Sequence, residues 1–276
     1  MIIDSHQHFW NYNPIRDSWI DDSMGIIKKD FLPKDLHPIL SANHVDGCIA
    51  VQADQSEEET EFLLQCAKEH LFIKGVVGWV DLKSEQVEER LEHFSKNKLL
   101  KGVRHIVQAE ADDFMLDSKF MNGISKLERF NLTYDILVFP RQLPAAVELA
   151  KAFPNQKFVL DHIAKPRISE VIADDWLNNI QLLAENPNVS CKISGMVTET
   201  KDFNWKKRDF TPFLDAVVTA FGMDRLLFGS DWPVCLLAAQ YEDILEIIKD
   251  YFEAYPTEVI DKVLGGNTTR IYNLKL

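Results

Sequence analysis

Two histidines near the start of the chain have the spacing of a shared binding site. His6 and His8 lie on either side of Gln7, at the end of an apolar segment. Alternate residues of an extended strand point to the same side, so both imidazoles are directed at one place if this segment is a strand. That geometry suits a metal ion. An isolated H-x-H also occurs on solvated surface strands, so the spacing alone leaves both interpretations open.

Further ionisable residues stand at or near the ends of later apolar segments: Arg104, His105, Asp135, Asp161, His162, Lys192 and Asp231. The other four histidines fall within predicted helices or at helix ends, where solvated or capping roles explain them. A buried charge is costly unless it is paired or bound to a metal. If the fold brings these residues to one rim, the group predicts a ligand site.

Three of the histidines and one carboxylate can form a metal-ligand set. His6, His8, His162 and Asp231 offer three nitrogen atoms and one oxygen, the mixture that a borderline divalent cation such as zinc prefers. Such an ion lowers the pKa of a bound water, and Asp231 can take the proton as well as bind the ion. Each residue also has a simpler explanation: Asp231 as a turn residue before a proline, and His162 as a side chain held by the preceding aspartate.

The elements that must position these residues alternate along the chain. Eight short apolar or β-branched segments begin near residues 2, 46, 74, 101, 132, 157, 189 and 225. Apolar residues at helical spacing predict intervening helices, among them 56–70, 84–94, 140–153, 173–186, 209–222 and 241–252. Ser56 with Glu59 predicts a capped helix start, and Ser84 predicts a second one in the same way.

This alternation predicts an α/β fold, a (β/α)8 TIM barrel with possible distortion, and 276 residues agree with that size. No linker divides the chain, so we expect one domain over residues 1–276. An open doubly wound sheet is the alternative, but the sequence has no G-x-G-x-x-G turn for a dinucleotide. In a barrel the active site lies at the carboxyl ends of the strands, where the ionisable residues stand.

A long segment over residues 9–33 separates the first strand from its helix. It contains Trp10, Tyr12 and Trp19. Loops of this length in compact barrels usually close over a ligand site. The alternative is an ordered plug that packs on its own aromatic residues.

The composition excludes several classes of partner. Hydrophobic residues make up 46% of the chain, enough for a core, and no apolar run approaches the length of a membrane span. Lys and Arg number 30 against 43 Asp and Glu, a formal net charge of -13 that repels nucleic acid and anionic membranes. The four cysteines are widely spaced and no export signal is found, so we expect a cytoplasmic protein. The sequence does not determine the oligomeric state.

Six segments together resemble the amidohydrolase superfamily. They are the opening D-S-H-Q-H-F-W, G-V-R-H, L-D-H-I-A-K-P, K-I-S-G-M-V-T-E, G-S-D-W-P and the closing L-G-G-N-T-T-R-I-Y. They extend from residue 4 to residue 272 and are most similar to a branch of sugar-lactone and muconolactone hydrolases, which includes L-fuconolactone and L-rhamnonolactone hydrolases. The resemblance implies a distorted (β/α)8 barrel that hydrolyses a cyclic ester.

The resemblance also implies roles for individual residues. His6, His8 and Asp231 match the family's metal positions, and His162 matches a strand-six histidine that joins the metal or assists the reaction. Binuclear members bridge two ions with a carbamylated lysine or a glutamate after strand four, where this chain has arginine and histidine instead. We therefore expect one divalent ion, zinc or similar. Some lactonases of this branch use no divalent metal and polarise the carbonyl with arginine and histidine, a task that Arg104 can serve.

The predicted reaction is hydrolysis of a sugar-derived lactone bound beneath the 9–33 segment. Asp231 deprotonates the water that attacks the lactone carbonyl. The metal, or Arg104 with His105, stabilises the oxyanion, and His162 protonates the departing ring oxygen.

Four side chains are expected to contact the substrate. Trp10 presents an aromatic face to the apolar side of the sugar ring, and Arg104 with His105 faces the carbonyl. Lys192 together with Arg104 favours an anionic or polyhydroxylated substrate. Lys192 has a second interpretation, in which it pairs with a neighbouring aspartate.

Three other functions compete with lactone hydrolysis. A decarboxylase of the same superfamily would act on an aryl carboxylate, and the aromatic 9–33 segment is compatible with it. A metal-dependent nuclease also starts with H-x-H, but the acidic net charge and the missing strand-four glutamate argue against it. A non-enzymatic sugar-binding barrel would not need three histidines to converge on Asp231.

Overall fold

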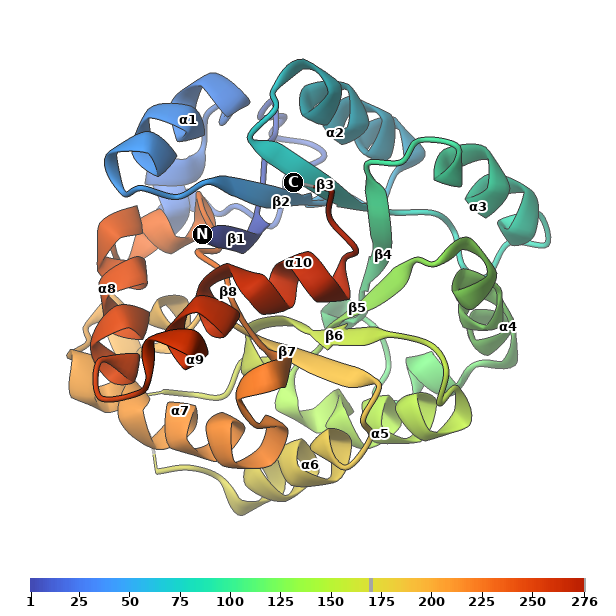
Figure 1. Cartoon of the computed structure of the whole chain (residues 1–276). Coiled ribbons are helices and arrows are strands. Elements are labelled where there is room, and N and C mark those ends of the chain that lie inside the picture. The colour runs from blue at the N-terminus through green and yellow to red at the C-terminus, as the bar shows by residue number, and fades with distance from the viewer. Residues whose placement is uncertain (169–170, 276) are drawn as a thin grey trace.

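Eight parallel strands form one barrel-shaped sheet in the computed structural model, which describes residues 1–168 and 171–275 (Figure 1). Each strand pairs in parallel with the next one along the chain. The strands are Ile3–Gln7 (β1), Gly47–Val51 (β2), Ile73–Gly78 (β3), Leu100–Ile106 (β4), Thr133–Leu137 (β5), Phe158–Leu160 (β6), Val189–Ile193 (β7) and Leu226–Phe228 (β8). All eight lie in the predicted apolar segments, and the predicted (β/α)8 barrel is confirmed.

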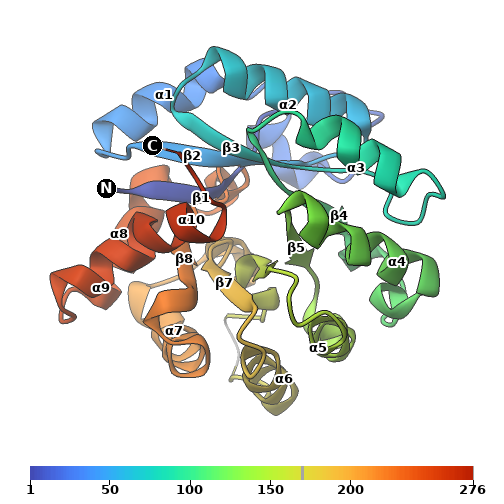
Figure 2. The same cartoon turned by 45° about the vertical axis from the view of Figure 1, so that its right-hand side comes forward.

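The helices pack around the outside of this sheet (Figures 1 and 2). They are Pro33–Ala42 (α1), Glu57–Glu69 (α2), Val87–Ser95 (α3), Ser118–Leu127 (α4), Leu143–Ala152 (α5), Asp174–Ala184 (α6), Lys207–Phe221 (α7), Tyr241–Phe252 (α8), Thr257–Asp261 (α9) and Asn267–Ile271 (α10). Among the described residues, no helix combines the length and the apolar character needed to cross a membrane.

The two predicted helix caps differ in outcome. At α2 the Ser56 side chain accepts the Glu59 backbone N–H at 3.2 Å, as predicted. The prediction for Ser84 is wrong, because α3 begins at Val87 and its N-cap is Gln86. The Ser84 hydroxyl instead accepts the Gln86 backbone N–H at 3.1 Å. This local turn competes with helix formation, so the helix begins after it.

Two layers of apolar side chains stabilise the barrel. The larger one lies between the strands and the surrounding helices. The smaller one fills the barrel itself and is built from buried residues of β1, β2, β3, β6 and β8 together with the C-terminal segment: Ile3, Ile49, Val51, Val77, Val159, Leu227, Ile271, Tyr272 and Leu274. In Figure 1, α10 lies across the amino-terminal end of the strands. The interior of the barrel is therefore packed and closed at that end, and a ligand can reach the interior only from the other end.

The barrel is distorted at the seam between β1 and β8, which form no regular ladder within the described residues. Two backbone hydrogen bonds cross the seam beyond the end of β8. The Asp231 N–H donates to the His6 carbonyl at 2.8 Å, and the His8 N–H donates to the Trp232 carbonyl at 2.7 Å. The closure of the seam therefore places Asp231 directly beside the two histidines of β1.

The 9–33 segment forms a closed loop above the carboxyl ends of the strands. Its two ends are joined by an antiparallel bridge in which Trp10 and Phe31 exchange backbone hydrogen bonds of 2.9 Å. The Trp10 ring is buried against Phe31 and lies edge-on to Trp19, whose side chain remains 44% exposed. The base of the loop is thus packed on its own aromatic residues, while its tip is free to face a ligand.

Candidate active site at the carboxyl ends of the strands

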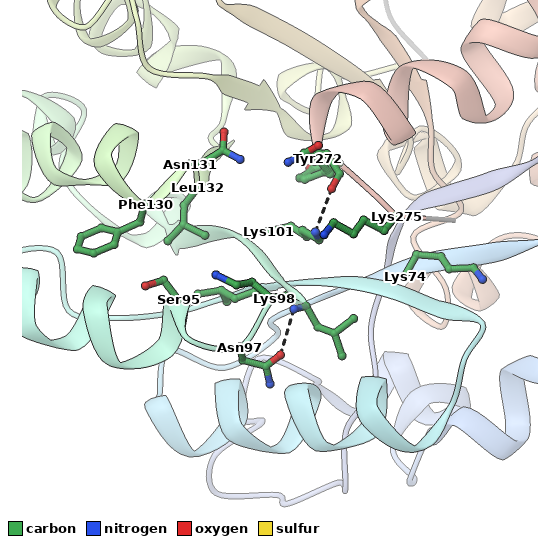
Figure 3. Close-up of a pocket in the computed structure, with 13 residues that line it drawn as sticks. Lys74, Ser95, Asn97, Lys98, Lys101, Phe130, Asn131, Leu132, Tyr272 and Lys275 are labelled. Carbon is green, nitrogen blue, oxygen red and sulfur yellow. Dashed lines mark hydrogen bonds between the residues drawn. The ribbon is translucent and has the colours of Figure 1, made fainter.

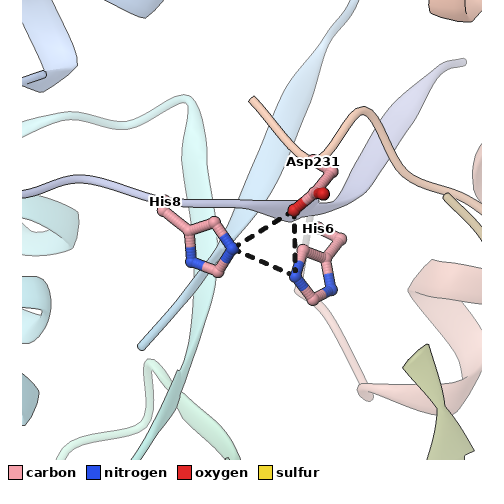
Figure 4. A group of neighbouring side chains, drawn as sticks. All are labelled: His6, His8 and Asp231. Carbon is pink, nitrogen blue, oxygen red and sulfur yellow. Dashed lines mark hydrogen bonds and ion pairs between the residues drawn. The ribbon is translucent and has the colours of Figure 1, made fainter. Parts of the chain in front are cut away.

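Three imidazoles surround the carboxylate of Asp231. Asp231 Oδ1 lies 3.4 Å from His8 Nε2, 3.7 Å from His6 Nε2 and 3.8 Å from His162 Nε2. The two Nε2 atoms of His6 and His8 are 3.2 Å apart (Figure 4). All four side chains are buried. The structure therefore brings together the four residues that the sequence suggested as one metal-ligand set.

Outer hydrogen bonds orient two of the imidazoles toward this centre. His8 Nδ1 lies 2.8 Å from the Val51 carbonyl, and because a carbonyl oxygen only accepts, the proton is on Nδ1. His162 Nδ1 lies 2.9 Å from Ser194 Oγ. With their Nδ1 atoms engaged, both rings turn an Nε2 atom toward Asp231, the arrangement that metal-binding histidines adopt.

His162 is aimed by an unusual stretch of backbone. Residues 162–165 all have positive φ angles, 53°, 48°, 60° and 50°, so the chain after β6 makes a left-handed turn. This conformation is costly, above all for the β-branched Ile163. A Cβ atom on the neighbouring Gly195 would lie 2.5 Å from His162 Nδ1. The ring therefore fits only because position 195 has no side chain.

The donor set fits a divalent metal ion. In a tetrahedral zinc site with Zn–N distances near 2.0–2.1 Å, neighbouring ligand atoms are about 3.3–3.4 Å apart. The His6–His8 and His8–Asp231 separations of 3.2 and 3.4 Å match this spacing, and the other two separations, 3.7 and 3.8 Å, are slightly wider. His6 Nδ1 also lies 3.3 Å from Asp161, a carboxylate placed to support a metal-bound imidazole.

The protonation states of His6, His162 and Asp231 agree with metal binding. Burial lowers the pKa of His6 and of His162 well below its usual value, so both rings are neutral at pH 7. Burial by itself would raise the pKa of Asp231, but the attraction of His162 and the contact with His8 outweigh it and lower that pKa. The Asp231 carboxylate and the neutral rings of His6 and His162 can therefore bind a metal ion or accept a proton.

A second layer of charges lies beneath the histidines. Lys192 is fully buried, and its Nζ lies 2.6 Å from Asp135, 2.9 Å from Asp161 and 3.2 Å from His6 Nδ1. Burial opposes ionisation of Asp161, but Lys192, His6 and Arg104 outweigh it and hold the pKa of this carboxyl well below its usual value. This layer fixes the orientation of His6 from below.

Arg104 reaches the same centre from β4. Three N–H groups of Arg104, on Nε and Nη2, donate to the side-chain and backbone oxygens of Gln52. A fourth, on Nη1, donates to Asp161 at 2.9 Å. The guanidinium group has five N–H donors, so one remains. Nη1 lies 3.3 Å from His6 Nε2, and the remaining donor faces this centre.

A cavity of about 550 Å³ opens above these groups. Its size is in the range of small-molecule sites. It is lined by the carboxyl ends of the strands and by the 9–33 segment, and its lining includes His8, Trp10, Arg16, Trp19, Gln55, Arg104, His162, Lys165 and Asp231.

Two of the expected substrate contacts lie elsewhere. Lys192 lies beneath the histidines and is fully buried by its ion pairs, which agrees with the second interpretation of that residue. His105 points to the outside of the barrel, where its ring stacks on Phe114 at 4.8 Å and pairs with Glu110 at 3.2 Å. The reason is the alternation of side chains along β4, which turns Arg104 inward and its neighbour outward.

Several residues of the site were not singled out from the sequence. Gln52 and Ser194 orient Arg104 and His162, and Lys165 lines the cavity while pairing with Glu199 at 3.1 Å. Each follows the end of a strand, so position in the barrel was an available signal. Neutral side chains such as glutamine and serine occur at many strand ends, however, and their type alone does not mark a site.

Several known proteins are similar to this chain over nearly its whole length. The family described as Amidohydrolase matches residues 3–274. An L-fucono-1,5-lactonase of Burkholderia multivorans is 40% identical over 99% of this chain and 96% of its own, and one of Burkholderia ambifaria is 35% identical over 99% and 95%. A crystal structure of a Burkholderia multivorans amidohydrolase with bound zinc superposes with a TM-score of 0.96 at 39% identity, covering 100% of both chains.

Proposed function

Since the chain belongs to the amidohydrolase family, we propose that it hydrolyses a sugar-derived lactone such as L-fucono-1,5-lactone to the aldonic acid. The observation that carries the proposal is the convergence of the Asp231 carboxylate with the imidazoles of His6, His8 and His162 at the base of a cavity of about 550 Å³. The similarity to two lactonases over nearly the full chain supports the same substrate class.

We propose that one zinc ion belongs to the site, held by His6, His8 and Asp231 with His162 beside them. The 3.2 to 3.8 Å separations of the donor atoms support this assignment, and a related structure contains bound zinc. When bound, such an ion acidifies a water molecule and polarises a carbonyl oxygen.

The protein's own residues carry the proton transfers. Asp231 accepts a proton from the water that attacks the lactone carbonyl, and the new C–O bond converts the carbonyl oxygen into an oxyanion. The remaining N–H of Arg104 faces this region and stabilises the negative charge. When the ring C–O bond breaks, the departing alkoxide takes the proton back, directly from Asp231 or through His162 Nε2. Hydrolysis thus consumes one water and yields one hydroxy acid.

The substrate is held by the mouth of the cavity. Trp10 and Trp19 offer aromatic surface to the apolar face of a sugar ring, and Gln55 and Lys165 offer polar groups to its hydroxyls. The net charge of -13 supports a small-molecule substrate over nucleic acid, and four free, buried cysteines support a reducing cytoplasm. We also propose that residues 1–276 act as one domain, since all eight strands share one sheet.

A pH-indicator assay tests the proposal directly. Purified protein is mixed with L-fucono-1,5-lactone and with L-rhamnonolactone in weak buffer, and acid release is compared with that of buffer alone. We expect a rate well above the spontaneous one, which falls after chelation and returns when zinc is added. Rates equal to buffer for every lactone, before and after zinc addition, would refute the substrate class. Full activity after complete metal removal would refute the metal assignment alone.

A further inference from the structure

A second cavity, of about 380 Å³, lies at the opposite end of the barrel (Figure 3). It is formed where β3, β4 and β5 begin, next to the C-terminal segment that follows α10. Lactone hydrolysis has no use for this end, since the catalytic groups all lie at the carboxyl ends of the strands. Its volume is nevertheless sufficient for a small ligand.

Four lysines line this cavity, which we call the basal pocket: Lys74, Lys98, Lys101 and Lys275. The clustering contrasts with a chain whose net charge is -13. Within residues 1–168 and 171–275, these lysines form no ion pair with a carboxylate, whereas other lysines such as Lys83, Lys126, Lys151 and Lys207 do. The pocket therefore concentrates positive charge that the described chain leaves uncompensated.

Two of these lysine side chains, Lys74 and Lys101, pack against glycines of neighbouring strands. A Cβ atom on Gly75 would lie 2.5 Å from Lys101 Cγ, and one on Gly47 would lie 2.8 Å from Lys74 Cε. The hydrocarbon stems therefore lie on bare glycine backbone at the strand starts. Lys101 Nζ also donates to the Asn273 carbonyl at 3.0 Å, which fixes its position at the pocket.

The positive charges in the pocket act on one another. Burial lowers the pKa of Lys101, and the nearby Lys275 and Lys98 lower it further. Each of these effects opposes the charged form of Lys101, so an anion near Lys98, Lys101 and Lys275 would be attracted by these three ammonium groups and would relieve their repulsion. Amide groups of Asn97 and Asn131 line the same pocket and can donate hydrogen bonds to oxygen atoms.

We propose that the basal pocket binds a small oxyanion carrying at least two negative charges, of the phosphate or polycarboxylate class. Several ammonium groups suit a multiply charged ligand, because each one adds a charge-assisted contact. The concave shape and limited volume favour a small molecule over an extended polyanion. The site is independent of the lactone reaction, so it stands whether or not that reaction is correct.

Isothermal titration calorimetry with inorganic pyrophosphate, at low ionic strength where exposed charges are least screened, tests the proposal. We expect one site per chain and a rise in Tm with ligand concentration. Replacing three pocket lysines in one variant, Lys98→Gln, Lys101→Gln and Lys275→Gln, is expected to weaken binding at least tenfold. The rate of lactone hydrolysis by this variant should equal that of wild type, which shows that the barrel is intact.

A matched variant separates a specific site from general charge attraction. It removes three exposed lysines of the outer helices, Lys34→Gln, Lys68→Gln and Lys249→Gln, and so has the same net charge as the pocket variant. We expect it to bind pyrophosphate like wild type. Equal weakening in both variants, or no binding by wild type to either pyrophosphate or citrate, would overturn the proposal. Tighter binding of pyrophosphate than citrate would assign the phosphate class, and the reverse order would assign the polycarboxylate class.

Discussion

Positively charged side chains are buried and ion-paired at one end of the barrel, and unpaired with carboxylates of the described residues at the other. At the carboxyl end, Lys192 is fully buried between Asp135 and Asp161, and Arg104 shares the second of these carboxylates. At the amino end, four lysines line one pocket, and none is paired with a carboxylate of the described residues. Burial explains the difference, because a charge removed from water needs a partner, whereas a charge at the surface can keep its hydration.

This difference separates two uses of charge. The paired charges beneath the histidines set the geometry of a reaction centre, and their partners are part of the fold. The unpaired lysines of the basal pocket remain available to a ligand from outside. Substitutions that exchange or remove charges at one end should therefore have effects that matched substitutions at the other end lack.

The largest effect is expected from Asp231→Asn. The amide cannot accept the proton of the attacking water, and loss of a general base typically lowers the rate by about 10²–10⁴-fold. We expect a loss of this size in kcat for L-fucono-1,5-lactone, together with a lower zinc content measured by elemental analysis. The control is Asp224→Asn, an exposed position before β8 whose loss should leave the rate near that of wild type. An active Asp231→Asn protein would contradict the assigned role.

Lys192→Met and Lys101→Met compare the same substitution at the two ends of the barrel. The first leaves two buried carboxylates without their cation, and breaking a buried pair in this way costs about 3–5 kcal/mol. The second removes a lysine without a carboxylate partner in the described chain, so its effect should stay within about 0.5 kcal/mol. Urea unfolding measures both. Similar losses in the two variants would show that pairing does not distinguish the two ends.

Gly195→Ala tests how the position of His162 is determined. The new Cβ would lie 2.5 Å from His162 Nδ1, so the ring must leave its present position beside Asp231, and we expect at least a tenfold lower kcat. Gly222→Ala is the control, since Gly222 also has a positive φ, 68°, but open space around it. In both variants, the backbone strain of a side chain at a positive φ angle costs about 1–3 kcal/mol of stability. Equal activity in the two variants would mean that the contact with His162 is unimportant.

The last comparison concerns the pH dependence of stability and a carboxylate at the carboxyl end that the backbone holds in place. Glu59 accepts the N–H groups of Ala53 and Asp54, directly after β2, and burial raises its pKa from 4.5 to about 8. Between these pH values the folded protein keeps a proton that the unfolded chain has lost, so this group makes stability fall as pH rises.

Glu59→Gln removes that titration. The free energy of unfolding of the variant minus that of wild type should therefore increase as the pH rises from 4.5 to 8, as followed by urea unfolding at several pH values. Glu58→Gln, at an exposed neighbouring position, should retain the wild-type dependence. A Glu59→Gln profile identical to wild type would place the titration elsewhere.

Local pattern was sufficient for the fold and for part of the site. Alternating apolar runs and helical spacing predicted all eight strands, because each element is selected by the periodicity of its own residues. The pair His6 and His8 could be predicted for the same reason, since residues two positions apart in a strand lie on the same side of the sheet. The start of α3 was misplaced, because Ser84 can cap a helix or form a turn and its sequence does not say which.

The sequence suggested His6, His8, His162 and Asp231 as one set, but only the tertiary structure decided how they meet and which other charged residues share their centre. Arg104 and His105 are adjacent in sequence, and the barrel turns the first inward and the second outward. Asp231 meets His6 and His8 because the seam between the first and last strands closes just beyond β8. The basal pocket combines lysines from four separate positions along the chain.

The physical reason for this division is the range of the interactions. Hydrophobic periodicity acts over a few neighbouring residues and is written in each segment, so the chain specifies its strands and helices locally. Ion pairs and metal-ligand distances depend on how segments more than 200 residues apart are placed to within about 1 Å. That placement comes from the packing of the whole barrel, and no single segment carries it.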